Sequence, residues 1–351
     1  MKQKIKLANQ TIGLNCPPFL IAEMSGNHNH SLEKALAIVD AAAASGAHAL
    51  KIQTYTPETM TLDISEGEFF IDDPKSLWKG KSLYKLYGEA MTPWEWHFAI
   101  KDRCEQNGIL FFSTPFDFTA IDFLEKLDVD FYKIASFENT DIPLIKKVAK
   151  TGKPIIISTG MASLEELTET IEAAQGAGCK DLVLLKCTSA YPATPKDANL
   201  MTIPDLRKRF GVEVGLSDHT MGIGVAIASV ALGATVIEKH FTLDRKEGGV
   251  DSAFSMEPAE FSLLAKESKK AWESLGKVYY ERSEDETKSL TYRRSIYIVE
   301  DVNEGDILNE NNLRCIRPGL GLPPKYYEML LGKKIKYNLK KGTAMKMEYI
   351  G

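Results

Sequence analysis

Eight short apolar runs between residues 19 and 242 constrain the fold more than any other feature of this chain. Each run is rich in Ile, Val, Leu or Phe, and each is followed by a segment with the apolar spacing of a helix. The runs cover residues 19–24, 49–55, 110–115, 131–136, 154–160, 182–189, 212–220 and 235–242. Buried strands that alternate with helices are typical of parallel sheets. Eight such units predict the α/β class and, within it, a (β/α)8 TIM barrel.

The chain is longer than a barrel requires, since the chain has 351 residues and such a barrel needs about 250. We expect an N-terminal hairpin and the barrel over residues 1–280, followed by a polar, acidic linker over residues 281–290. Short apolar pairs separated by turns predict a small β-rich domain over residues 291–351. Residues 56–91 form a long insertion after the second strand, which makes them a candidate lid or substrate loop.

The composition excludes several classes of protein. A net charge of −5 offers no polycationic surface for nucleic acid, so any anionic substrate must be held by local cations. The five cysteines contain no Cys-x-x-Cys pair and are expected to be reduced thiols. No apolar run reaches the roughly 18 residues of a membrane span, and the N-terminus lacks the apolar core of a signal peptide. These features predict a cytoplasmic protein that does not bind membranes.

Every predicted strand ends in polar side chains that can bind a ligand or react. They are Glu23, Lys51, Thr114, Lys133 with Ser136, Ser158, Ser189, Ser217 with His219, and Glu238 with His240. Any one of them is most simply a solvated strand end. Because all eight strands end this way, and because barrels place their active sites at this end, the set together favours an active site.

The last two strands predict a metal site. Ser217 and His219 are two residues apart, as are Glu238 and His240, so each pair points to one side of its strand. Lys239 must then face the helices, where its charge needs a partner that the sequence does not identify. Neighbouring strands would bring the two imidazoles together, although an accidental placement of two histidines is the alternative.

Imidazole ligands with nearby carboxylates suit Mn²⁺, Fe²⁺, Co²⁺ or Zn²⁺ better than Mg²⁺. We expect Mn²⁺ on His219 and His240, with Co²⁺ or Mg²⁺ as alternatives. Open coordination positions would let the ion polarise a carbonyl as a Lewis acid. Lys51 and Lys133, with several hydroxyls and glycine-flanked amides, suit a compact polyanion, most simply phosphate.

The chain resembles the sialic acid synthase family over nearly its whole length. The motifs that carry the resemblance are AEMSGNHNHS, KIQTYTPETMT, STPFD, YKIASFENTD, ISTGMAS, KCTSAYPA, GLSDHT, EKHFTLD and RPGLGLPP. The resemblance implies a metal-dependent enzyme that condenses phosphoenolpyruvate with an amino sugar, cleaving the C–O bond and releasing phosphate. It also implies that the last segment is an antifreeze-like (SAF, β-clip) domain.

The resemblance assigns roles to particular residues. The phosphoenolpyruvate contacts carry over to Lys51, Thr114, Lys133, Ser136, Ser158, Ser189 and Ser217. Catalytic carboxylates carry over to Glu23, Glu238 and Asp251, and the metal ligands to His219 and His240. Sugar contacts carry over to Glu138, Tyr191 and Arg317, the last of which the family supplies from the partner subunit of a domain-swapped homodimer. Which carboxylate is the general base stays open.

Two departures from the family pattern bear on the sugar. Ser189 stands where sialic acid synthases have Asn, and Met24-Ser25-Gly26 replaces an Ile-Gly pair. These changes favour a 2,4-diacetamido-trideoxyhexose over N-acetylmannosamine as the acceptor, with the acceptors of N-acetylneuraminate and legionaminate synthases as alternatives.

Two other classes of function remain as alternatives. A class I aldolase on the same barrel would use Lys51 or Lys133 to form a Schiff base. A sugar-binding protein without activity would keep the C-terminal domain but lose strand-end residues, and none is obviously missing here.

Overall fold

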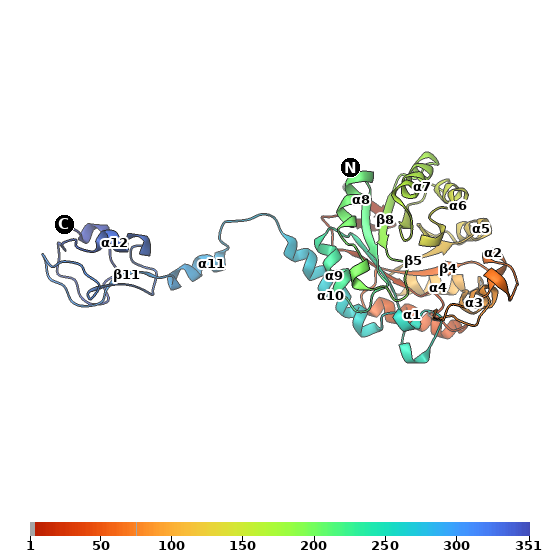
Figure 1. The fold of residues 1–351 in the computed structure, drawn as a ribbon, viewed down its shortest axis with the longest axis horizontal. Coiled ribbons are helices and arrows are strands. Elements are labelled where there is room, and N and C mark those ends of the chain that lie inside the picture. The colour runs from red at the N-terminus through yellow and green to blue at the C-terminus, as the bar shows by residue number, and fades with distance from the viewer. Residues whose placement is uncertain (1–3, 75) are drawn as a thin grey trace. The chain divides into compact units, whose positions relative to one another are not determined.

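The computed structural model describes residues 4–74 and 76–351. They form two compact units, Met1–Gly276 and Lys277–Gly351, which are described separately. The first is the predicted barrel, and in Figure 1 its helices surround its strands.

Eight parallel strands close the barrel in the order β10-β3-β4-β5-β6-β7-β8-β9. The strands are β3 (Phe19–Glu23), β4 (Ala49–Thr54), β5 (Leu110–Pro115), β6 (Tyr132–Ile134), β7 (Ile155–Ser158), β8 (Leu182–Cys187), β9 (Glu213–Ser217) and β10 (Val236–His240). The predicted fold class is therefore confirmed, and each predicted apolar run supplies one strand. Closure pairs β10 with β3 in a register that sets His240 opposite Glu23.

The helices that follow the strands form the outer layer. They are α1 (Leu32–Ala44), α4 (Trp96–Gln106), α5 (Phe118–Leu127), α6 (Ile142–Ala149), α7 (Leu164–Gly176), α8 (Thr202–Phe210), α9 (Gly224–Ala231) and α10 (Pro258–Leu275). Capping residues start several of them; the Ser31 side chain accepts a hydrogen bond from the Lys34 amide at the start of α1. Helix α4 begins at Trp96, and the hydroxyl of Thr92, four residues before it, lies 3.3 Å from His28 Nε2.

The interior of the barrel is apolar at one end and polar at the other. The hairpin of β1 (Ile5–Leu7) and β2 (Gln10–Ile12) packs its apolar residues against inward-facing side chains such as Ile21 and Phe112. Because side chains alternate along a strand, Glu23 lies on the same face as Ile21, one step closer to the carboxyl end. The hairpin thus closes the amino end, and the carboxyl end is left to polar groups.

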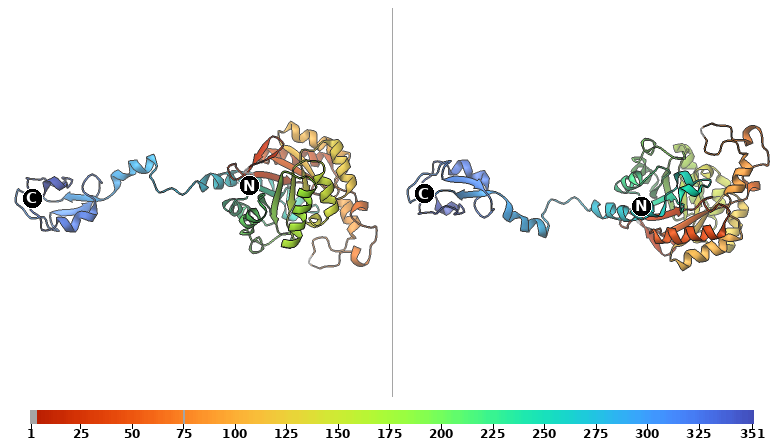
Figure 2. Two further views of the ribbon diagram at one scale, coloured as in Figure 1. Left: turned by 90° about the horizontal axis from the view of Figure 1, so that it is seen from above. Right: turned by 90° about the horizontal axis from the view of Figure 1, so that it is seen from below.

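The insertion after β4 contains two helices, α2 (Pro57–Met60) and α3 (Leu83–Ala90). Both views of Figure 2 show the orange segment between them at the margin of the N-terminal unit. His30 Nε2 lies 2.8 Å from the Gly88 carbonyl oxygen and holds α3 to the loop after β3. Movement of this insertion as a lid stays a prediction.

The second unit has its own small core around Ile296, Leu313 and Leu330. Its strands β11 (Ser295–Ile298) and β12 (Leu313–Ile316) pair antiparallel, and α12 covers Tyr327–Leu330. The segment predicted as a linker contains a short helix, α11 (Glu284–Ser289), which Ser283 and Glu286 start with reciprocal capping bonds. Within the described residues of both units, no helix is long and apolar enough to cross a bilayer.

Candidate active site

A cavity of about 410 Å³ lies at the carboxyl end of the barrel strands. It brings together nearly all of the predicted barrel residues: Glu23, Lys51, Lys133, Ser136, Glu138, Ser158, Ser189, Tyr191, Ser217, His219, Glu238, His240 and Asp251. Two predicted residues are not among those lining it. Thr114 is buried in β5, and Arg317 is exposed directly after β12 in the second unit.

The floor of the cavity is a buried cluster of two lysines and two glutamates. Lys51 Nζ donates to Glu238 Oε1 at 2.9 Å and lies 3.2 Å from Glu23 Oε2. Lys133 Nζ lies 3.7 Å from Glu238 Oε1. The Ser217 hydroxyl donates to the same oxygen at 3.2 Å. Four strands, β3, β4, β6 and β10, therefore place their charges around one point.

The two glutamates of this cluster have opposite pKa shifts. Burial and the Glu238 charge raise the pKa of Glu23 to about 7, although Lys51 lowers it in part. Burial also disfavours ionised Glu238, but Lys133 and Lys51 outweigh it and lower the pKa to about 2. Two carboxyl groups whose surroundings separate their pKa values can take different roles in acid–base chemistry. Near neutral pH Glu238 is an anion, whereas Glu23 can take up or give up a proton.

Lys133 is held rigidly beneath the cavity. Its Nζ donates to Ser158 Oγ at 2.7 Å and to the Ile134 carbonyl oxygen at 3.1 Å. Burial lowers its pKa to about 8, against the attraction of Glu238. It therefore remains mostly protonated at neutral pH.

Small side chains around Gly160 form a cradle of donors. The Gly160 amide donates to Ser136 Oγ at 3.1 Å. A Cβ at position 160 would lie 2.2 Å from Ser189 Oγ and 2.6 Å from Ser136 Oγ, so only glycine fits here. Hydroxyls from the loops after β6 and β8 thus meet next to Lys133 and Ser158. Such a group of small donors beside an ammonium suits an anion with several oxygens, such as phosphate.

The two histidines meet as the sequence predicted, with ring centroids 5.3 Å apart. His219 Nδ1 lies 2.9 Å from the Thr188 carbonyl oxygen, which fixes the ring and leaves Nε2 for a ligand. Burial and the charge of His219 lower the pKa of His240 well below its usual value, so its ring is neutral. Its Nδ1 is buried without a hydrogen bond in the described residues, 3.9 Å from Asp251 Oδ2.

These features fit a divalent metal ion bound by two histidines. The His240 imidazole is neutral and has a free nitrogen, which is the form that ligates metals, and His219 would bind an ion in the same neutral form. Within the described part of the chain, no group of three His, Cys, Asp or Glu side chains is arranged to hold an ion. The remaining coordination positions would therefore fall to water or substrate, as is usual for a catalytic rather than a structural metal.

Other buried polar atoms around the cavity also lack partners among the described residues. They are Glu238 Oε2, Glu138 Oε2 and Thr114 Oγ1. Burial raises the pKa of Glu138 to about 7. Because folded proteins satisfy nearly all buried polar groups, the unpartnered carboxylate atoms of Glu238 and Glu138 in the same cavity as His240 Nδ1 indicate a site that a ligand completes.

Gln53 is among the cavity residues that the sequence reasoning missed, and the role of Ser25 there was not foreseen either. Gln53 Nε2 donates to Glu23 Oε1 and to Ser25 Oγ, each at 3.2 Å, and the Ser25 hydroxyl donates to Asp251. Gln53 lies two residues after Lys51 on β4, so side-chain alternation could have identified it. This chain of bonds orients Glu23 and ties it to the loop that carries Asp251.

The unnamed partner of Lys239 is Asp218. Lys239 Nζ donates to Asp218 Oδ2 at 2.9 Å and to the carbonyl oxygens of Thr220 and Gly222 at 2.6 and 3.1 Å. Lys239 faces away from the cavity, as strand alternation predicted.

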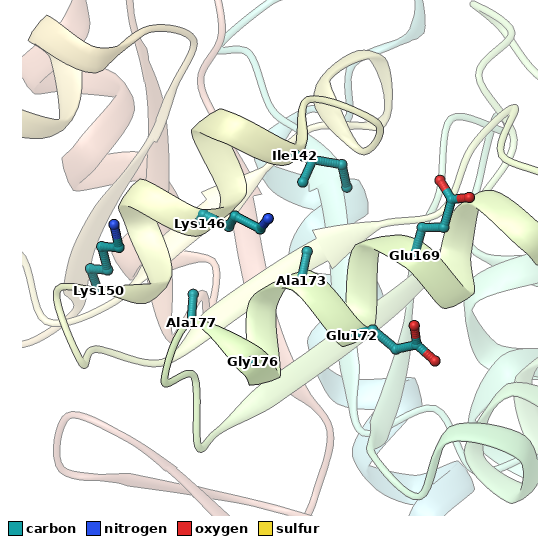
Figure 3. A pocket seen from close by; sticks show the side chains of 8 residues that line it. All are labelled: Ile142, Lys146, Lys150, Glu169, Glu172, Ala173, Gly176 and Ala177. Atoms are coloured by element: carbon teal, nitrogen blue, oxygen red, sulfur yellow. The ribbon is translucent and has the colours of Figure 1, made fainter.

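A second hollow, of about 640 Å³, lies between α6 and α7 (Figure 3). Its charged side chains, Lys146 and Lys150 on one helix and Glu169 and Glu172 on the other, are all exposed. It has no buried polar floor, so the barrel cavity is the candidate active site.

Sequence comparisons agree with this geometry. The model of the NeuB family matches residues 38–280, and the model of the SAF domain matches residues 293–346. The chain belongs to the NeuB family. The predicted family resemblance and the predicted C-terminal domain type are therefore confirmed.

Two relatives are named pseudaminic acid synthase. The protein from Campylobacter jejuni is 44% identical over 93% of this chain and 95% of its own length. The protein from Helicobacter pylori is 41% identical over 95% of this chain and 98% of its own length. Within the family, the motifs quoted above resemble this branch most, and these relatives confirm the resemblance.

A solved structure supports the assignment to the family. The N-acetylneuraminic acid synthetase of Leptospira borgpetersenii, in complex with citrate, matches with a TM-score of 0.72 and 34% identity. The match covers 83% of this chain and 96% of that chain. Synthases of the NeuB family are generally metal-dependent, and the identity of the ion stays a prediction.

Proposed function

We propose that this chain is a pseudaminic acid synthase. It condenses phosphoenolpyruvate with 2,4-diacetamido-2,4,6-trideoxy-β-L-altropyranose, which reacts as its open-chain aldehyde. One water is consumed, the C–O bond of phosphoenolpyruvate breaks, and phosphate and a nine-carbon nonulosonic acid are released. The enzyme works in the cytoplasm, where phosphoenolpyruvate is produced. The observation that carries the proposal is the buried Lys51–Glu238–Lys133 cluster, with its donor cradle, beside two neutral or ligand-ready imidazoles.

The donor cradle binds phosphoenolpyruvate. Lys51 and Lys133 come from strands on different sides of Glu238 and supply two positive charges. The hydroxyls of Ser136, Ser158 and Ser189 supply further donors, and Ser217, whose hydroxyl donates to Glu238, lines the same cavity. Thr114 supports this group from β5, because its buried hydroxyl has no partner among the described residues. The cluster holds C3 of phosphoenolpyruvate in position to attack the aldehyde carbon.

Glu23 is the proposed general base that positions and activates the attacking water. Its pKa of about 7 allows it to accept a proton near neutral pH, and Gln53 fixes its orientation. Glu238 has a pKa of about 2 and remains an anion, which stabilises the cationic C2 that forms after C3 attacks. Asp251, bonded to Ser25, completes the catalytic set beside His240.

His219 and His240 hold the metal ion, for which Mn²⁺ is proposed, with Co²⁺ or Mg²⁺ as alternatives. When bound, the ion acts as a Lewis acid on the aldehyde oxygen. The Thr188 carbonyl keeps the His219 ring in place, and Tyr191 packs against it with ring centroids 4.5 Å apart.

Glu138, Tyr191 and Arg317 are the proposed sugar contacts. Arg317 acts from the partner subunit of a domain-swapped homodimer, where its planar fork donates several hydrogen bonds at once. Arg317→Ala should then raise the acceptor KM and leave the phosphoenolpyruvate KM nearly unchanged. A mixture of Arg317→Ala with His219→Ala should regain activity, because one site of each hybrid combines the intact halves. No recovery under conditions of proven subunit exchange would remove Arg317 from this role.

A class I aldolase is the second candidate, and the lowered pKa of Lys133 is the observation that favours it. The Lys133 amine is, however, bonded to Ser158 and Ile134 and ion-paired to Glu238. Reduction with borohydride in the presence of substrate leaves a covalent adduct only for an aldolase.

Phosphate release tests the proposed reaction directly. The metal-loaded enzyme is given phosphoenolpyruvate with a panel of N-acetylated hexoses, and phosphate and nonulosonic acid are measured together. We expect the 2,4-diacetamido-trideoxyhexose to give the highest kcat/KM. Equal or faster turnover of N-acetylmannosamine or of the legionaminate precursor would assign the enzyme to another branch of the family.

A further inference from the structure

The cavity has a second side whose chemistry differs from that of the charged floor. This side comes from the insertion between β4 and α4, and we call it the insertion wall. It consists of Met60, Ile71, Trp78, Leu83, Leu86 and Tyr87. None of these six side chains carries a charge at neutral pH, and five of them are hydrocarbon, thioether or indole groups. The sequence predicted a substrate loop here but not which residues contact the substrate.

Hydrogen bonds to the rest of the barrel hold the insertion wall in place. The Trp78 indole N–H donates to the Val250 carbonyl oxygen at 3.0 Å, which joins the insertion to the loop that carries Asp251. The Ile71 amide donates to the Lys81 carbonyl oxygen at 3.0 Å and closes the segment on itself. Because the only hydrogen-bond donor of the Trp78 side chain is bonded to Val250, Trp78 presents an apolar ring to the cavity.

Tyr191 connects the insertion wall to the histidines. Its ring centroid lies 6.1 Å from that of Trp78 and 4.5 Å from that of His219. Tyr191 therefore offers a path from the histidines to Trp78. Along this path, an acceptor with its C1 aldehyde at the histidines would place its C4 and C6 groups against apolar side chains.

We infer that the insertion wall selects acceptors with a methyl group at C6 and an acetamido group at C4 over acceptors with hydroxyls there. This inference rests on the proposed function and assigns its specificity to particular residues. A methyl group gains contact with an apolar wall, whereas a hydroxyl gives up hydrogen bonds to water that the wall does not replace. Apolar pockets discriminate by about 10- to 200-fold for each such group.

Serine substitutions in the insertion wall test this assignment in the full-length, Mn²⁺-loaded enzyme. Ile71→Ser and Leu83→Ser should each lower kcat/KM for the 2,4-diacetamido-trideoxyhexose by about 10- to 100-fold. Turnover of N-acetylmannosamine should not fall, and the phosphoenolpyruvate KM should stay unchanged. Leu77→Ser is the matched control, because Leu77 is on the same segment, 52% exposed and outside the cavity lining, and it should leave both acceptors unaffected.

The possible results distinguish a failure of the proposed wall from a failure of the proposed reaction. Wild-type enzyme that prefers N-acetylmannosamine overturns the proposed function and the wall's role together. The wall alone is overturned if the wild-type enzyme has the expected preference but its wall variants do not change it. This is the case if kcat/KM falls for neither acceptor, or falls equally for both. Stabilisation of each variant by phosphoenolpyruvate in thermal melts shows whether the barrel is folded, so a damaged protein is not counted as a loss of selectivity. If both variants fail to fold, Ile71→Thr, which keeps the branched shape of the side chain and adds a hydroxyl, is judged by the same ratio: an acceptor preference that does not shift toward N-acetylmannosamine overturns the wall.

Discussion

Strands β9 and β10 present charged groups on both faces, and the two faces satisfy them differently. On the outer face, the Lys239 ammonium has three acceptors: Asp218 and two backbone carbonyls. On the inner face, Glu238 Oε1 accepts from Lys51, but Oε2 has no partner in the described residues, nor has His240 Nδ1. Both faces are almost completely buried.

This difference separates a charge whose hydrogen bonds are completed by the protein itself from polar atoms that are left without partners. An ammonium has three donors, so the fold itself satisfies Lys239 completely. Buried atoms without partners are costly, so the inner face keeps them where a ligand can satisfy them. Substitutions on the outer face should therefore change stability, and those on the inner face should change catalysis.

Removal of the metal should have the largest effect on the inner face. Chelation should abolish turnover, and Mn²⁺ or Co²⁺ should restore it better than Ca²⁺, because imidazole ligands disfavour the harder, larger ion. Circular dichroism should show the barrel still folded. Full activity after dialysis against excess chelator would show that the two histidines hold no catalytic ion.

Lys239→Met should have the largest effect on the outer face. It leaves the Asp218 carboxylate buried and unpaired, so the free energy of unfolding should fall by about 3–5 kcal/mol in urea titrations. The kcat/KM of the folded fraction should hardly change. Asp218→Asn, added to Lys239→Met, should recover part of the stability. A stable but inactive Lys239→Met enzyme would contradict the division between the faces.

Lys51→Ala is the matched change on the inner face. Losing one preorganised donor should cost about 3 kcal/mol of transition-state stabilisation, so kcat/KM for phosphoenolpyruvate should fall roughly 100-fold. Stability should fall less than in Lys239→Met, because Glu23, whose pKa is about 7, can take up a proton when its cation is removed. Steady-state kinetics and urea titrations measure both. Unchanged kinetics would exclude Lys51 from substrate binding.

The pH dependence of Lys133 should give the smallest effect. Burial lowers its pKa to about 8, so it loses its proton as the pH rises through that value. We expect kcat/KM for phosphoenolpyruvate to fall by up to about tenfold per pH unit above pH 8. Lys133→Arg should shift this decline to higher pH, because arginine stays protonated. A decline that Lys133→Arg does not move would belong to another group.

The same pKa fixes the sign of the stability change. An unfolded lysine keeps its proton to about pH 10.4, so between about pH 8 and pH 10 the unfolded chain binds more protons than the folded one. The contribution of Lys133 to stability therefore rises with pH across this window. The difference in unfolding free energy between wild type and Lys133→Met should show this slope.

Local patterns were enough to predict the barrel and the direction of its side chains. Apolar runs such as Ile155–Ser158 are buried throughout and end in a polar residue, which marks both the strand and its functional end. Alternation placed His219, His240 and Glu238 on one face and Lys239 on the other. The same alternation could have identified the partner of Lys239. Asp218 lies between Ser217 and His219, so its side chain points to the outer face, as that of Lys239 does.

The rest of the site depends on distances between side chains of different strands, and the sequence alone does not give these distances. The separate pKa values of Glu23 and Glu238 follow from two lysines on β4 and β6, which approach only when the barrel closes. Short helices such as α2, of four residues, are too brief for a periodic pattern. Trp78 lies in a segment without regular structure, so only its contacts with Val250 and Tyr191 in the folded chain show that it lines the cavity.

The pairing of β3 with β10, which closes the barrel, also determines when the site can form during synthesis of the chain. Glu23 leaves the ribosome early and His240 late, yet their strands are neighbours in the finished barrel. A growing chain therefore has neither the pair of His219 and His240 nor the floor of the cavity until the whole barrel has been synthesised. Pairing of segments so distant in sequence is slow, because the intervening chain must first be ordered. The cavity of the site therefore forms only with the last pairing of the barrel.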